Sequence, residues 1–81
     1  MDHPSYLPLS GLSEGAQARV CALHLSGGMR RRLQDLGLVA GTRVTCLQRA
    51  AGGDPTAYRI RGAVIALRQD DTARIEIGGA P

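Results

Sequence analysis

Residues 43–68, RVTCLQRAAGGDPTAYRIRGAVIALR, contain the pattern that decides the fold. Apolar and polar side chains alternate over residues 43–49, which places Val44 and Cys46 on one face of a half-buried strand. Residues 52–55, GGDP, follow closely and are the strongest turn signal in the chain. The segment therefore predicts a strand that is followed by an abrupt reversal of the chain.

Two further apolar runs, residues 57–61 and 63–68, flank Gly62, and this spacing predicts a β-hairpin. Residues 69–71 turn the chain again, and the alternation over residues 73–77 predicts a last strand. Short apolar runs separated by glycine-rich turns are typical of a compact β fold with abrupt corners.

Residues 29–36 follow a different period. Met29, Leu33 and Leu36 lie at i, i+4 and i+7, which is the spacing of one apolar face on a helix. Gly37 comes next, at the position where a helix commonly ends in a left-handed residue. We therefore expect one short helix whose apolar face packs against the sheet.

Residues 17–25, QARVCALHL, are apolar on both faces and predict the first strand. With this strand the pattern predicts a mainly β fold of five short strands and one inserted helix, which avoids exposed edges by curling into a small barrel. We expect the barrel to span residues 9–77, after a flexible leader at residues 1–8 and before a tail at residues 78–81.

The composition narrows the classes of protein to consider. A chain of 81 residues holds one domain. Its formal net charge is +3, and all of its lysine-or-arginine positions are arginine. No apolar run reaches the length of a membrane span, and the first residues lack the features of a secretory signal. Cys21 and Cys46 lack a CxxC spacing and are expected to be reduced. These features predict a cytoplasmic protein without direct membrane insertion.

Several short motifs follow one another between Leu9 and Ile77 in an order that is more specific than any of them alone. They are Leu9 with Gly15, Arg32-Leu33, Leu36-Gly37-Leu38 with Gly41, Gly53-Asp54-Pro55, Tyr58, Gly62, Ile65-Ala66-Leu67-Arg68, and Ala73 with Ile75. Together they resemble the FeoA family over nearly the whole chain. The resemblance implies an SH3-like barrel that acts on the cytoplasmic side of the ferrous iron permease FeoB, peripheral to the inner membrane.

The same resemblance implies a non-catalytic accessory protein of ferrous iron transport that needs no cofactor. A related domain forms the C-terminal part of some iron- and manganese-responsive repressors, so a metal-responsive module that binds a transition metal is an alternative. A scaffold for a larger assembly of the transporter also stays open. Small barrels with exposed strand edges can pair through them, so a homo-oligomer is open as well.

We expect the partner-binding surface on the helix, its exit and a nearby strand, at Arg30, Arg31, Arg32, Leu38 and Arg68. Arg32 and Arg68 adjoin apolar stripes, and two interpretations apply to them. Their aliphatic stems can cover the barrel while the charged groups stay in water. Alternatively, they grip an acidic or carbonyl group on the partner.

Five residues are interpreted as a structural turn motif. Gly37, Gly41 and Gly62 are expected at backbone conformations that a Cβ would resist. Asp54, before Pro55, is expected to cap a turn with its carboxylate, with a direct metal or partner contact as the alternative.

The candidate metal ligands are scattered polar side chains, namely His3, Cys21, His24, Cys46 and Asp54. Cys21 and His24 are three residues apart, which on a regular strand sends their side chains to opposite faces. Alternation places His24 on the face of Val20 and Ala22. No local spacing matches a metal site, so we expect no specific one, and His24, Cys21 and Cys46 remain as candidates.

Features of enzymes and of nucleic-acid-binding proteins are missing from the sequence. The glycines lack the following Lys-Ser/Thr of a phosphate-binding loop, and no nucleophile–base pair can be proposed. A small barrel that binds nucleic acid is a further alternative, but only Tyr6 and Tyr58 could stack on bases and the net charge is small. We therefore expect neither catalysis nor nucleic-acid binding.

Overall fold

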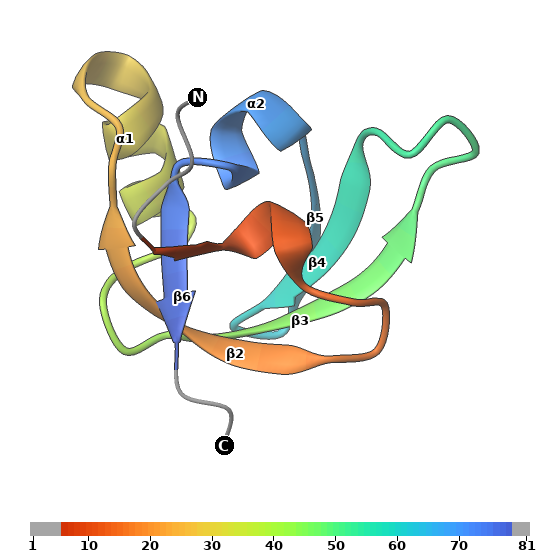
Figure 1. Ribbon diagram of the computed structural model, residues 1–81. Helices are drawn as coiled ribbons and strands as arrows, with labels where there is room; N and C mark the ends of the chain where they lie inside the picture. The colour runs from red at the N-terminus through yellow and green to blue at the C-terminus, as the bar shows by residue number, and fades with distance from the viewer. Residues whose placement is uncertain (1–5, 79–81) are drawn as a thin grey trace.

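The computed structural model describes residues 6–78, and within this range six strands form one sheet. The strands are β1 (Leu7–Pro8), β2 (Gln17–Leu23), β3 (Arg43–Arg49), β4 (Thr56–Ile60), β5 (Ala63–Leu67) and β6 (Ile75–Gly78). Their order across the sheet is β1-β6-β2-β3-β4-β5, and every neighbouring pair is antiparallel. Figure 1 shows the sheet curled around one interior.

Three short helices connect the strands: η1, a 3-10 helix (Leu9–Gly11), α1 (Gly27–Asp35) and α2 (Gln69–Thr72). In Figure 1, α1 and α2 lie toward the same end of the sheet. Leu33 of α1 is buried, and Met29 and Leu36 pack against the core from the same side, which confirms the predicted apolar face. No helix within residues 6–78 is long and apolar enough to cross a bilayer.

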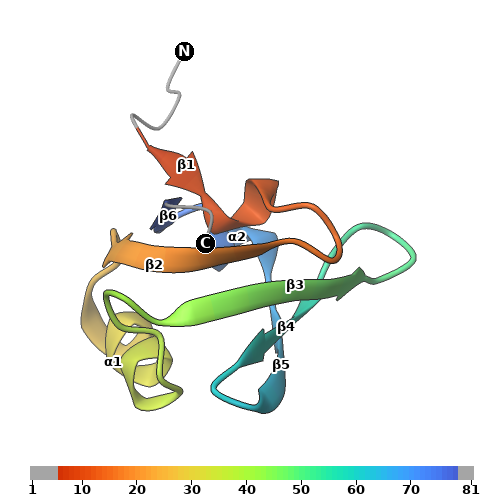
Figure 2. The same cartoon turned by 90° about the horizontal axis from the view of Figure 1, so that it is seen from below.

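Two irregularities in the strand pairing curl the sheet. The register of β2 against β6 shifts between Val20 and Ala22, and that of β3 against β4 shifts between Cys46 and Gln48. An extra residue on one strand bends that strand and increases its twist. The sheet therefore wraps into a small barrel, seen along another direction in Figure 2, with β1 and β5 at the two ends of the strand order.

The core consists of apolar side chains from five of the strands, α1, η1 and the loop after α1. They are Leu9, Ala18, Val20, Leu23, Leu33, Leu38, Val44, Cys46, Tyr58, Ile60, Leu67, Ile75 and Ile77. Val44 and Cys46 are both fully buried, as their alternation predicts. Tyr58 is the largest side chain in this core and is only 1% exposed.

A two-residue turn joins β4 to β5. Arg61 and Gly62 have φ values of 51° and 83°, and two successive positive φ angles are what a type I′ turn requires. Ile60 and Ala63 pair directly across this turn. The hairpin predicted around Gly62 is therefore confirmed. Arg61, which was expected at the end of its first strand, is the first of the two turn residues.

The sequence pattern does not reveal two of the elements. β1 lies within the segment expected to be a flexible leader, and its Leu7 pairs with Ile77 of β6. Residues 1–5 and 79–81 lie outside the described part of the chain. The helix α2 replaces the simple turn expected at residues 69–71. A two-residue strand and a single helical turn are too short to produce a periodic pattern, so the predicted five strands become six.

The irregularity in β2 also corrects the expected position of His24. Strict alternation groups His24 with Val20 and Ala22, but the register shift lies between those two residues and changes the alternation. As a result Val20 and Leu23 are buried, while His24 is exposed.

We expect Gly37→Ala to destabilise the protein more than Gly41→Ala. Both glycines have positive φ, 102° and 92°, so each alanine carries backbone strain of about 1–2 kcal/mol. A Cβ at Gly37 would also meet the Arg61 side chain, whereas nothing lies within 4 Å of a Cβ at Gly41. Urea unfolding of both variants measures the difference. Equal losses of unfolding free energy would show that the Arg61 side chain moves aside without cost.

Candidate partner-binding surface

A groove of about 280 Å³ lies between α1 and the segment of β5 and α2. It is lined by Met29, Arg32 and Leu33 from α1, Ala66 and Leu67 from β5, and Arg68 and Asp71. Leu33 and Leu67 are buried, whereas Arg32 and Arg68 are exposed. The groove is therefore apolar at depth and basic toward solvent, since the two arginines outnumber the one carboxylate, that of Asp71.

The groove brings together two of the five predicted partner-binding residues. Arg32 and Arg68 are far apart in the sequence, but both line it. Arg31 is exposed and lines a different hollow, on another side of α1. The groove thus pairs one predicted arginine of the helix with the one at the end of β5, while Arg31 stays a prediction.

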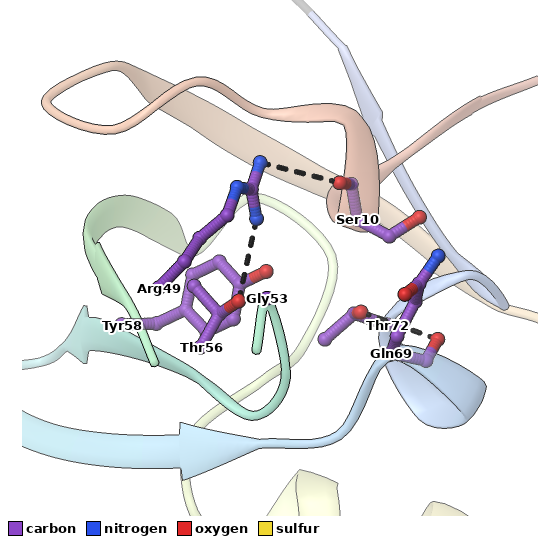
Figure 3. Close-up of a pocket in the computed structure, with 7 residues that line it drawn as sticks. All are labelled: Ser10, Arg49, Gly53, Thr56, Tyr58, Gln69 and Thr72. Carbon is purple, nitrogen blue, oxygen red and sulfur yellow. Dashed lines mark hydrogen bonds between the residues drawn. The ribbon is translucent and has the colours of Figure 1, made fainter. Parts of the chain in front are cut away.

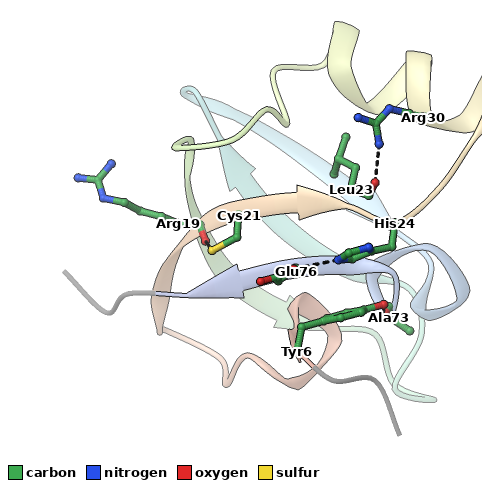
Figure 4. A network of polar contacts seen from close by, with 8 residues as sticks. All are labelled: Tyr6, Arg19, Cys21, Leu23, His24, Arg30, Ala73 and Glu76. Carbon is green, nitrogen blue, oxygen red and sulfur yellow. Dashed lines mark hydrogen bonds and ion pairs between the residues drawn. The ribbon is translucent and has the colours of Figure 1, made fainter. Parts of the chain in front are cut away.

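Leu38 and Arg30 both make contacts within the domain. Leu38 is 0% exposed in the core, so it cannot contact a partner in this fold, and its predicted role is corrected. The Arg30 guanidinium donates hydrogen bonds to the backbone carbonyl groups of Leu23 and Leu25 (the first of these contacts is drawn in Figure 4). Arg30 therefore holds the start of α1 against the end of β2.

A second, more polar pocket of about 240 Å³ lies beside Arg49, at the end of β3 (Figure 3). Its lining consists of Ser10, Arg49, Gly53, Thr56, Tyr58, Gln69 and Thr72. The Arg49 guanidinium donates to the carbonyl oxygen of Leu12 at 2.7 Å and to Thr56 Oγ1 at 3.3 Å. The Glu14 carboxylate accepts the backbone N–H of Arg49 at 2.8 Å. Arg49 thus ties the segment before β2 to the β3–β4 hairpin.

Burial favours the neutral forms of two ionisable groups in and near this pocket. Burial raises the pKa of Tyr58, although the nearby Thr72 hydroxyl partly opposes the shift. Burial also raises the pKa of the Cys46 thiol, with a smaller opposing effect of the Arg49 charge. The pocket therefore offers hydroxyl groups and one fixed cation, an arrangement suited to binding and to packing.

The five residues of the predicted turn motif lie in the connections between the helices and strands. Gly37, Gly41 and Gly62 all have positive φ, in agreement with their interpretation as turn residues. Asp54 Oδ1 accepts the backbone N–H of Gln69 at 2.9 Å, so its carboxylate caps the start of α2 instead of its own turn. The carbonyl oxygen of Pro55 accepts the N–H of Ala50 at 2.9 Å and closes the β3–β4 loop.

His24 belongs to a polar contact network between β2, β6 and the first described residues (Figure 4). Its Nε2 atom lies 2.9 Å from Glu76 Oε1 on β6. Its ring stacks on Tyr6, with ring centroids 4.2 Å apart, and the Tyr6 hydroxyl donates to the carbonyl oxygen of Ala73 at 3.2 Å. His24 therefore helps to fix Tyr6 beside β6.

The candidate metal ligands do not form a set. Cys46 is buried in the core, while Cys21 and His24 are exposed on β2 and just after it. Within residues 6–78, no three histidine, cysteine, aspartate or glutamate side chains come together in a way that could hold a metal ion. His3 lies outside the described residues.

A sequence model of the FeoA domain matches residues 7–78, which is nearly the whole chain. The chain belongs to the FeoA family. Its predicted membership is thereby confirmed, and with it the assignment to a family of non-catalytic accessory domains associated with ferrous iron transport. The matched range begins at β1 and ends with β6.

Solved FeoA structures have the same fold. The FeoA protein of Chlorobium tepidum is 34% identical, with a TM-score of 0.84 over 88% of this chain and 68% of that one. The FeoA protein of Stenotrophomonas maltophilia, described as a prokaryotic SH3-domain protein and solved with zinc, is 28% identical with a TM-score of 0.79 over 89% of each chain. The predicted SH3-like barrel is therefore confirmed.

A curated relative is a fusion protein of Porphyromonas gingivalis that joins Fe(2+) transport protein A to the Fe(2+) transporter FeoB. It is 38% identical to this FeoA chain over 69 residues, or 85% of the chain. The chain spans only 8% of that protein's length.

Sequence reasoning did not place two features of this FeoA domain. The groove forms between α1 and β5, and no short-range pattern specifies how distant segments pack. Arg49 looks like any outward residue of an alternating strand, although it anchors Leu12.

We expect one of the two thiols to react with a thiol reagent while the FeoA domain is folded. Cys21 is exposed, whereas burial both shields Cys46 and raises its pKa, which keeps the thiol protonated. With a chromogenic disulfide reagent, the absorbance of the thiolate that it releases should report one rapidly reacting cysteine per chain in buffer and two in denaturant. The Cys21→Ser variant should lose the rapid equivalent, and rapid labelling of Cys46 in that variant would contradict the burial.

Proposed function

We propose that this domain binds the cytoplasmic part of a FeoB-type ferrous iron permease and modulates iron uptake without catalysing a reaction. The observation that carries the proposal is the identity of 38% to a protein in which Fe(2+) transport protein A and FeoB are one polypeptide. Fusion keeps two domains at a high effective concentration, which favours even a weak contact between them.

The groove between α1 and β5 supplies a suitable surface. Arg32 and Arg68 present planar, permanently charged groups that match the geometry of a carboxylate. Met29 lines the same groove and is only half-buried, so it provides the apolar contact. Interfaces in which a central apolar contact is flanked by arginine are common among protein complexes.

A domain with this role works at the cytoplasmic face of the inner membrane and is held there by its partner. Its own contribution is to bind and to bias the permease, in keeping with its membership of a family of non-catalytic accessory domains. The metal-responsive alternative gains no support from the arrangement of Cys21, His24 and Cys46.

Calorimetric titration against the soluble GTP-binding domain of the permease tests the function. The wild-type domain should bind, and Arg32→Glu and Arg68→Glu should each weaken the affinity by about tenfold or more, because each reverses a charge at the contact. The affinity should also fall as salt screens the charges.

Arg43→Glu is the matched control, since Arg43 is an exposed arginine of β3 that does not line the groove. It changes the net charge equally and should leave the affinity nearly unchanged. If the wild-type domain fails to bind with nucleotide and lipid present, the proposed function is wrong. If all three variants weaken binding alike, net charge and not the groove is responsible.

A further inference from the structure

The strand β5 has a free edge. It lies at one end of the strand order and pairs only with β4 (Figures 1 and 2). Within residues 6–78, its backbone takes part in no hydrogen bond outside this pairing. The strand at the other end, β1, has two residues and includes Pro8, which has no N–H group. The five residues of β5 therefore form the longer unpaired edge of the sheet.

The register shows which backbone groups face outward. In a two-residue hairpin turn the residues that flank the turn are hydrogen-bonded to each other, here Ile60 and Ala63. Antiparallel pairs alternate between bonded and non-bonded, so the pair formed by Arg59 and Val64 is non-bonded. The N–H and C=O groups of Val64, and two residues later those of Ala66, consequently point away from β4.

The strand itself lacks the features that normally prevent strand addition, and α1 faces its C-terminal end across the groove. The sequence of β5, AVIAL, contains no charged residue and no proline, and its pairing with β4 shows no register shift. Val64 is 62% exposed, the most exposed of the large apolar side chains in the described residues. An exposed strand of this kind is a template for pairing with another extended chain.

The charges around β5 select the partner. Arg61 precedes the strand by two residues, Arg68 follows it directly, and Arg32 lies across the groove. The acidic side chains on this side are Asp70 and Asp71 of α2, of which Asp71 lines the groove. A second copy of this chain would bring two such sets of arginines together along one edge, where like charges repel. An acidic chain would instead be attracted at both ends of β5.

We propose that β5 accepts an extended, acidic segment of a partner protein as an additional antiparallel or parallel strand, hydrogen-bonded to Val64 and Ala66. Main-chain bonds supply the affinity in this mode, and side-chain contacts supply the specificity. The added strand would lie beside the groove, with its carboxylates near Arg32 and Arg68. The inference deepens the proposed function, on which the identity of the partner rests, but the surface is tested without that partner.

Amide hydrogen exchange followed by NMR provides the direct test. The probe is a synthetic octapeptide in which glutamate alternates with valine and threonine. The Val64 and Ala66 amides should exchange rapidly in the free protein and about tenfold more slowly at about 90% saturation, because only the free fraction exchanges. Binding of the peptide without protection of these two amides would overturn the proposal.

Val64→Pro and Val64→Thr form a matched pair of variants. Proline removes the outward N–H group but no bond to β4, so the edge strand should keep its fold, which circular dichroism verifies. Threonine keeps the N–H group and the branched shape. We expect Val64→Pro to bind the peptide at least about tenfold more weakly, and Val64→Thr to bind nearly as the wild type does.

Altered peptides keep the test decisive if Val64→Pro does not fold. The same octapeptide with its four central amides N-methylated has the same charge but cannot donate to β5, and it should not bind. A version with lysine in place of glutamate should not bind either. Equal binding of either peptide would overturn strand addition or its charge preference.

The remaining outcomes separate this inference from the proposed function. If the permease domain binds the wild type and Val64→Pro equally well, the function stands and strand addition is wrong. If the acidic peptide protects Val64 and Ala66 but the permease domain does not bind, the surface stands and the partner is wrong. Sedimentation that shows a wild-type dimer absent from Val64→Pro would make a second copy the occupant and overturn the proposal.

Discussion

The turn at Arg61 and Gly62 fixes the register of β4 against β5, and both the core and the free edge depend on that register. Because side chains alternate along a strand, a slip by one residue would turn Tyr58 and Ile60 out of the core. The same slip would exchange the backbone groups that face β4 with those that face solvent. One short turn with two positive φ angles therefore determines what the domain buries and what it can bind.

The groove is a consequence of how this sheet curls. Register shifts in β2 and β3 bend the sheet, but β5 forms no ladder with β1, so hydrogen bonds do not close the barrel. α1 lies near this opening, with Leu33 anchored in the core and Arg30 bonded to the end of β2. A helix held at these points leaves room between itself and β5, and the groove occupies that room.

Much of the fold follows from the sequence because its signals are local. The strand at residues 43–49, the hairpin around Gly62 and the apolar face of α1 are all periodic patterns or turn residues, and the structure contains each of them. The position of His24 is not local, because it depends on a register shift that alternation cannot show. The burial of Leu38 and the meeting of Arg32 with Arg68 depend on how distant segments pack. The candidate site was therefore predictable in its residue types, but only partly in its members.

An unprotected strand edge in a small domain needs an explanation, since edge-to-edge pairing leads to aggregation. In this chain the arginines beside β5, and not charges within it, oppose self-association. Charges placed beside the strand, and not within it, have a physical advantage. Val64 and Ala66 keep an apolar, regular edge that can accept a strand, while Arg61 and Arg68 repel another copy of the same edge. Discrimination between partners then comes from a repulsive element as much as from an attractive one. Because both elements are the same arginines, a charge reversal that weakened partner binding would also remove the obstacle to self-pairing.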